Sequence, residues 1–160
     1  MRRAGLVVGA VLVLLAAAGG WIYNQIQSGF NTESELAMER ALTETTLARA
    51  DHVDYFAGEF IYRIVYGVNA DNEKLIVWVG PQEVHEAKAS DGVTRSDVRA
   101  FVEGSHGTVE WNRLVPGKYE DEYVWEAYFK KKEIGGVRPF YEYYRFRDGE
   151  RIDTLRLNIE

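Results

Sequence analysis

Histidines are the residues of this chain best suited to metal binding or general base catalysis, and His52, His85 and His106 are widely separated. None lies in an H-x-x-x-H or H-E-x-x-H arrangement, which would place two ligands on one face of a helix. His106 follows Ser105, but adjacent residues seldom point at each other, and no acid that would support the pair is identifiable. These patterns favour histidines with structural roles over a metal site or a nucleophilic site.

Two acidic segments are the other candidates for chemistry. Asn69, Asp71 and Glu73 alternate like the start of a calcium loop, but Lys74 stands where an EF-hand needs glycine. Residues 120–122 are three successive acids in a turn-like segment, where carboxylates usually keep ordinary protonation behaviour. Cysteine is absent, as are the G-x-S-x-G, P-loop and dinucleotide motifs. We therefore expect no enzyme, no metal and no cofactor.

Hydrophobic periodicity predicts the elements that carry these residues. A 3.6-residue period predicts a helix over 31–49, and Thr94 with Asp97 predicts the capped start of a second helix that ends at Gly104. Residues 82–93 are polar and predict a connector, and 116–122 and 130–138 are expected to be long loops. Alternation predicts a hairpin of two strands, over 55–68 and 75–79, followed by three or four further strands. Three of these are at 123–129, 140–146 and 152–159, and the fourth is a possible strand at 108–114.

This order of elements predicts an α+β fold made of two small modules. Each module has one helix packed on an antiparallel sheet, with the first at 31–80, a connector at 81–93 and the second at 94–160. The chain has 160 residues, of which 46% are apolar, so a packed core is within reach. Because each module alone is very small, we expect the two modules to pack together.

A membrane anchor is predicted at 4–23, twenty residues without a charge. A helix of this length rises about 30 Å, which matches the hydrocarbon core of a bilayer. Arg2 and Arg3 precede the segment, and Trp21 and Tyr23 suit its far interface. By the positive-inside rule, residues 1–3 form a cytoplasmic tail and the folded part lies outside the cell membrane.

A cleaved signal peptide is the competing interpretation, because residues 16–18 are alanines that resemble a cleavage site. Both interpretations export residues 31–160. These residues carry a net charge of −8, since Arg2 and Arg3 are the only charges before them in a chain of net charge −6. This charge disfavours binding to nucleic acids or to anionic wall polymers, and favours a protein partner.

Aromatic residues are concentrated in the last third of the chain. Alternation places Trp125 and Phe129 on one face of a strand and Tyr128 on the other. Most of these rings are expected in the core between the modules, and any exposed ones would be typical interface anchors. The candidate partner-binding residues are Trp111, Tyr119, Tyr141 and Tyr143.

Taken together, the basic tail, the single apolar segment and several apolar motifs resemble one family. The chain is similar to the YpmB-like family of Gram-positive bacteria, also called TseB-like cell wall elongation regulators. The similarity covers nearly the whole chain and rests on 48–53, 56–59, 66–67, 75–79, 98–103, 125–129, 143–146 and 148–149.

The resemblance implies one membrane span followed by two cystatin-like or PepSY-like modules outside the cell. It also implies a non-enzymatic adaptor that binds a class B penicillin-binding protein, the transpeptidase that crosslinks peptidoglycan during wall elongation. An inhibitor or modulator of an exported protease, of the PepSY type, is the alternative function. A wall hydrolase is a third, and it predicts that the isolated domain releases muropeptides.

Overall fold

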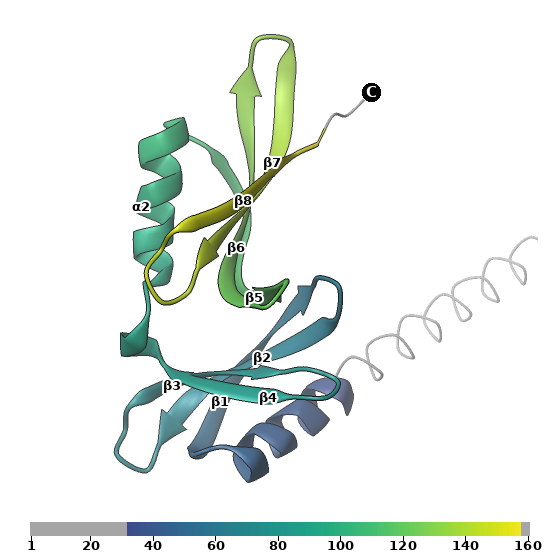
Figure 1. The fold of residues 1–160 in the computed structure, drawn as a ribbon, viewed down its shortest axis with the longest axis vertical. Helices are drawn as coiled ribbons and strands as arrows, with labels where there is room; N and C mark the ends of the chain where they lie inside the picture. The colour runs from purple at the N-terminus through teal and green to yellow at the C-terminus, as the bar shows by residue number, and fades with distance from the viewer. Residues whose placement is uncertain (1–31, 158–160) are drawn as a thin grey trace, which may run out of the picture. The chain divides into compact units, whose positions relative to one another are not determined.

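The structure is a computed structural model that describes residues 32–157 (Figure 1). The chain divides into two units, residues 1–36 and 37–160, and both sheets described below belong to the second unit. Among the described residues, no helix is long and apolar enough to cross a membrane. The residues predicted to set the membrane topology lie outside the described range, namely 4–23 with Arg2, Arg3, Trp21 and Tyr23.

The first sheet is antiparallel, and its four strands are neighbours in chain order. They are β1 (Leu47–Ala57), β2 (Ile61–Asn69), β3 (Lys74–Val79) and β4 (Val84–Lys88). Residues 32–44 form a helix, and its Ala37 and Ala41 are buried with Val65 and Val77 in one apolar cluster. Alanine side chains are short, so the helix lies close to the sheet. The first module is thus a helix on an antiparallel sheet, as predicted.

The first helix is shorter than predicted, because the chain leaves it at Thr45 and enters β1 at Leu47. The Thr45 hydroxyl donates to the Ala41 carbonyl oxygen at 2.5 Å and accepts from the Leu47 N–H at 3.1 Å. Such side-chain bonds compete with the helical backbone pattern. The predicted strand 55–68 is likewise two strands, since the chain turns at Gly58, whose N–H donates to the Phe60 carbonyl oxygen at 3.2 Å.

The segment 82–93, predicted as a connector, contains β4 and is therefore partly strand. Its residues pair with β3, with Val84 opposite Val79 and Ala87 opposite Ile76. A short 3₁₀ helix, η1 (Ala89–Asp91), follows it. An edge strand pairs on one side only and tolerates polar residues, so its composition is that of a loop.

The second sheet is also antiparallel with four strands in chain order. They are β5 (Glu110–Tyr119), β6 (Glu122–Glu133), β7 (Gly136–Arg145) and β8 (Arg151–Arg156). The segments predicted as long loops, 116–122 and 130–138, are instead strand ends joined by tight turns. These turns use backbone with positive φ at Glu120 (52°), Gly135 (99°) and Gly136 (131°).

Helix α2 (Arg95–His106) packs on this second sheet through the buried Val98 and Val102. The predicted capping start is confirmed: the Asp97 carboxylate accepts from the Thr94 N–H at 2.8 Å, and the Thr94 hydroxyl accepts from the Asp97 N–H at 3.2 Å. The helix passes through Gly104 and is capped by Gly107 at φ 73°. The prediction that it ends at Gly104 was wrong by one short turn, because a second glycine with positive φ caps the helix through its N–H, which donates to the Glu103 carbonyl oxygen.

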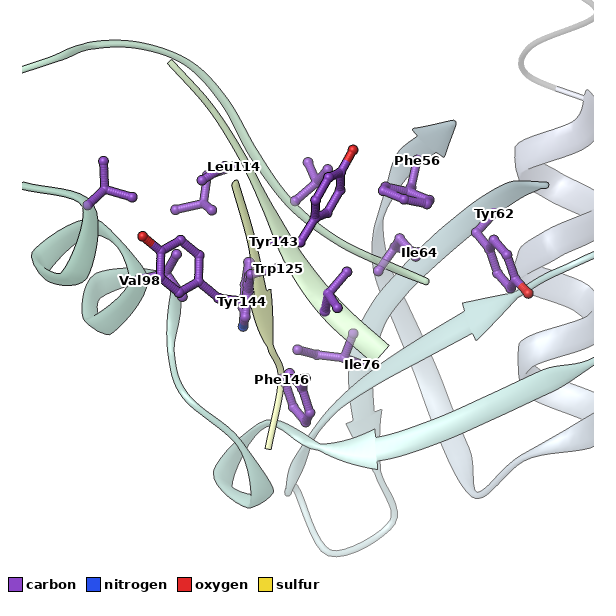
Figure 2. Close-up of a cluster of buried hydrophobic side chains, with 14 of the residues drawn as sticks. Phe56, Tyr62, Ile64, Ile76, Val98, Leu114, Trp125, Tyr143, Tyr144 and Phe146 are labelled. Carbon is purple, nitrogen blue, oxygen red and sulfur yellow. The ribbon is translucent and has the colours of Figure 1, made fainter. Parts of the chain in front are cut away.

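The two sheets share one hydrophobic core, which confirms that the modules pack together (Figure 2). Phe56 and Trp78 of the first sheet are fully buried in it. The Trp78 ring lies 5.1 Å from that of Tyr123 and 5.2 Å from that of Phe146 in the second half of the chain. At Gly117, a Cβ atom would lie 2.3 Å from the Phe56 ring, so β5 approaches β1 more closely there than any side chain would allow.

Candidate partner-binding surface

The strand register sorts the aromatic side chains of the second sheet onto two faces. Trp125 and Phe129 of β6 lie opposite Tyr144 and Phe140 of β7, and these four belong to the core that also contains Val98 of α2. The intervening residues project to the other side of the sheet, because successive side chains alternate. On that side, Tyr128 lies opposite Tyr141, and Glu126 lies opposite Tyr143.

Four tyrosines, Tyr119, Tyr128, Tyr141 and Tyr143, form what we call the tyrosine face. The rings are stacked in two pairs. Tyr128 and Tyr141 have centroids 4.4 Å apart with planes at 9°, and Tyr119 and Tyr143 have centroids 4.1 Å apart with planes at 15°. Stacked aromatic pairs restrict each other's rotamers, so this surface is ordered before any partner arrives.

A buried ion pair lies within this face. Glu126 is only 2% exposed, and it accepts hydrogen bonds from the Arg113 guanidinium and, at 3.3 Å, from the Tyr143 hydroxyl. Burial, followed by the nearby Glu126 carboxylate, raises the pKa of Tyr143. The Tyr119 hydroxyl is fixed similarly, since it donates to Asp153 at 2.6 Å. These phenols therefore stay neutral and serve as hydrogen-bond donors.

The open part of the face centres on Tyr128 and Tyr141. Both rings are half-buried, whereas Tyr143 is buried at 7% exposure. Leu155 of β8 lies opposite Tyr141 in the register and is 42% exposed. Burial raises the pKa of Tyr141, with a further contribution from its neighbour Tyr128. The result is a small apolar surface that carries two hydroxyl groups.

Trp111 does not belong to this surface, although it was predicted beside the three tyrosines. It lies opposite Phe129, on the side of the sheet that α2 covers. Its indole N–H donates to Glu103 of α2 at 3.1 Å, and the Arg99 guanidinium lies 4.7 Å from its ring centre. Trp111 thus fastens β5 to the helix, and the structure brings together only the other three predicted residues.

Tyr128 is the residue of this surface that the sequence analysis did not select. The signal was present, because alternation already placed Tyr128 on the face opposite Trp125 and Phe129. Its cross-strand partner could not be named, since the register between β6 and β7 depends on the turn at Gly135. Register is set by turn geometry, which alternation does not reveal.

The three histidines lie apart from each other in different contacts. The His52 Nε2 atom is 2.9 Å from Asp54, and the His85 ring stacks on Tyr123 with centroids 3.8 Å apart. Within residues 32–157, no group of three or more His, Cys, Asp and Glu side chains is placed to hold a metal ion.

His106 has an acidic partner that the sequence did not reveal. Its Nε2 atom is 2.8 Å from Glu142, a residue 36 positions away that is fully buried. Glu142 also accepts from the hydroxyl of Tyr144 at 2.6 Å and from Arg151 and Thr154 at 3.2 Å each. Ser105 itself is exposed. The contact between His106 and Glu142 therefore fixes the end of α2 to the sheet. The Glu142 carboxylate accepts hydrogen bonds from four side chains in all.

The two acidic segments form turns on the surface. Asn69 Oδ1 accepts from the backbone N–H groups of Asp71 and Glu73 at 3.0 and 2.9 Å, which closes the β2–β3 hairpin as predicted. Residues 120–122 are exposed at the β5–β6 turn.

A groove of about 510 Å³ adjoins the β5–β6 turn, and Glu83 is one of the carboxylates that line it. Glu83 accepts from Lys118 at 2.7 Å and from the Tyr62 hydroxyl at 2.6 Å. These hydrogen bonds, with that of Lys118 the larger, lower the pKa of Glu83. A carboxyl with a lowered pKa is a poor general acid at neutral pH, so this arrangement does not favour acid catalysis.

Comparison with known families assigns the first half of the fold. Residues 37–80 match the family described as the cell wall elongation regulator TseB-like domain. Residues 37–80 are thus similar to a TseB-like domain. The structure is similar to that of the YpmB protein from Bacillus subtilis, with a TM-score of 0.67 and 21% identity over 76% of this chain and 94% of that chain. At this identity the likeness shows a shared fold. No curated protein matches the chain.

These findings confirm the resemblance to the YpmB-like and TseB-like family that the sequence predicted. The TseB-like domain comprises β1, β2, β3 and the part of the first helix from Ala37. The tyrosine face lies on β5, β6 and β7, beyond the matched residues. The shared fold with YpmB extends to this second sheet, because it covers 76% of the chain.

Proposed function

We propose that this protein is a non-catalytic regulator of peptidoglycan synthesis that is anchored in the cell membrane and binds a class B penicillin-binding protein outside it. The TseB-like domain supports the regulatory role in cell wall elongation. The charge-free segment 4–23 behind Arg2 and Arg3 supports the anchor and its orientation. The transpeptidase partner is what the family resemblance implies, and the surface described above supports a protein partner.

The observation that carries a binding function is the pair of stacked, half-buried rings of Tyr128 and Tyr141. The other faces of the two sheets are occupied. The part of the first helix from Ala37 packs on one side of the first sheet, and the second sheet packs on its other side. Helix α2 covers the opposite side of the second sheet. The area around Tyr128 and Tyr141 remains accessible, with Leu155 beside it.

This surface has the chemistry of a protein interface. Tyrosine combines a large apolar ring with a hydroxyl, and it loses few rotatable bonds on binding. Stacking has already ordered Tyr128 and Tyr141, so less conformational entropy is lost when a partner binds. Membrane anchoring would add to this, because two proteins held in the same membrane meet at a high effective concentration.

Site-specific photo-crosslinking in living cells tests the proposal. A photoreactive amino acid replaces Tyr141 in the full-length chain, and captured proteins are identified by mass spectrometry. Phe101 is the matched control position, because it is a partly exposed aromatic residue on α2. A class B penicillin-binding protein captured from position 141 and not from position 101 is the expected result. Replacing 4–23 with an unrelated membrane span shows whether the anchor itself takes part.

Other captures would overturn the proposal. An exported protease crosslinked at position 141 would favour the inhibitor function, and the purified chain should then inhibit that protease stoichiometrically. Release of muropeptides from purified walls by the chain alone would make it a hydrolase. Capture of no wall-synthesis protein, in cells where a known membrane pair is captured, would remove the elongation partner.

A further inference from the structure

The hairpin that joins β6 and β7 carries an apolar tip in water. Ile134 at its apex is fully exposed, and Val137 is 50% exposed. Leu157, whose N–H donates to the Pro139 carbonyl oxygen at 3.0 Å, brings a further apolar side chain of 46% exposure beside the hairpin. The hairpin itself extends beyond the rest of the second sheet (Figure 1).

Cations surround this tip, although residues 31–160 are acidic as a whole. Two carboxylates pair with cations of this region, Glu133 with Arg156 at 2.7 Å and Glu110 with Lys130 at 3.8 Å. The five cationic residues are Lys130, Lys131, Lys132, Arg138 and Arg156.

The cations are set back from the apex by a distance that suits a membrane surface. A strand rises about 3.3 Å per residue, so Lys132 and Lys130 attach roughly 7 and 13 Å from Ile134 along β6. Interfacial apolar groups penetrate about 5–10 Å into the boundary between headgroups and acyl chains. With Ile134 at that depth, the lysines reach the level of the lipid phosphates.

We propose that this hairpin tip docks on an anionic lipid surface, with Ile134 in the interface and the lysines against the headgroup phosphates. Charge complementarity favours this partner, because each cation near an anionic bilayer strengthens its binding about fivefold. The shape also favours it. A specific protein interface buries about 800 Å² on each partner, which needs a broad surface, whereas the tip is a narrow convex projection. The tip would thereby orient the folded part relative to the membrane.

A fluorescent label at Ile134→Cys tests this directly. The chain has no cysteine, so a single thiol can be labelled with an environment-sensitive dye in the full-length protein. The labelled protein is reconstituted in phosphatidylcholine vesicles with and without phosphatidylglycerol. With phosphatidylglycerol, the emission should shift to shorter wavelength and the label should become protected from iodide. A label at Asp71→Cys, on the exposed β2–β3 turn, should stay accessible in both vesicles.

Neutralising two of the cations is the second part of this labelling experiment. The ratio of protected to accessible label should fall on the order of tenfold in the Lys131→Gln/Lys132→Gln variant, and added salt should lower it as well. Equal iodide access to Ile134→Cys in both vesicles would overturn the proposal. Protection that requires a purified transpeptidase and not phosphatidylglycerol would assign the tip to a protein partner instead. The lipid measurement needs no partner protein, so its result is independent of crosslinking at Tyr141.

Discussion

Trp111 and Arg113 are two residues apart in β5, yet their side chains lie on opposite faces of the second sheet. Regular alternation would place both on one face, but a register shift lies between them. Trp111 is therefore opposite Phe129 and contacts α2, whereas Arg113 is opposite Tyr128 and pairs with Glu126. Because of this one inserted residue, Trp111 contacts the helix while the Arg113 guanidinium lies within the tyrosine face.

Removing the open rings of the tyrosine face should weaken partner binding more than folding. The Tyr128→Ala/Tyr141→Ala variant is expected to lose about 2 kcal/mol of binding free energy, on the order of 30-fold in Kd. Its free energy of unfolding should fall by only about 1 kcal/mol, because both rings are half-buried. Phe60→Ala, at an exposed ring in the β1–β2 turn, should bind normally. Equal loss in both variants, measured by titration with purified transpeptidase, would contradict a role for this face.

Adding one methyl group at Gly117 should destabilise the contact between the sheets. Its Cβ would lie 2.3 Å from the Phe56 ring, and Phe56 is fully buried. Overpacking of this kind costs about 1–3 kcal/mol. Urea unfolding of Gly117→Ala should show this decrease in the free energy of unfolding, and the additional change Phe56→Leu should restore part of it.

Gly104 is the matched control for that glycine substitution. It lies inside α2, and a Cβ at this position meets no atom within 4 Å. Alanine favours a helix interior over glycine by about 0.5–1 kcal/mol. Gly104→Ala should therefore stabilise the protein, and a lower urea midpoint for both variants would contradict the packing argument.

Glu142 should be among the most sensitive polar positions of the chain. It is fully buried and accepts from four side chains, among them His106 and Arg151. Glu142→Ala leaves those donors without their acceptor and should cost about 3–5 kcal/mol. Thr154→Ala removes one of the four bonds and should cost about 1 kcal/mol. Thermal unfolding that places the two variants within error of each other would refute the role of the carboxylate.

Protonation of His85 should make the fold less stable in mild acid. Burial lowers the pKa of His85 below its ordinary 6.5. As the pH falls below about 6.5, the unfolded chain takes up a proton at this histidine that the folded chain resists. The free energy of unfolding must therefore decrease as the pH falls below about 6.5. Above that pH, protonation of His85 makes no contribution to stability.

The variant His85→Phe keeps a flat ring against Tyr123 and removes the titrating group. Between about pH 7.5 and pH 5.5 it should lose less stability than the natural chain, as measured by urea midpoints at each pH. His52→Phe is the comparison at an exposed ring. If His85→Phe and the natural chain lose equal stability over this window, His85 makes no contribution to the pH dependence.

Local patterns predicted much of this architecture. The capping pair Thr94 and Asp97, the β2–β3 turn at Asn69 and the two-module α+β plan all depend on residues close in sequence, whose hydrogen bonds and periodicity are short-range. The same patterns placed the end of the first helix too late. Its apolar periodicity continues across Thr45, but the residues from Leu47 onward form β1 and pair with β2.

Long-range pairing decided the features on which the binding surface depends. The tyrosine face exists because the register sets Tyr128 against Tyr141, and Trp111 is excluded from it by a bulge that no alternation pattern shows. Glu142 meets His106 across 36 residues only when α2 lies on its sheet. Residue types and their spacing determine which faces are apolar, whereas the closure of strands and helices around a common core determines which of those faces stays open.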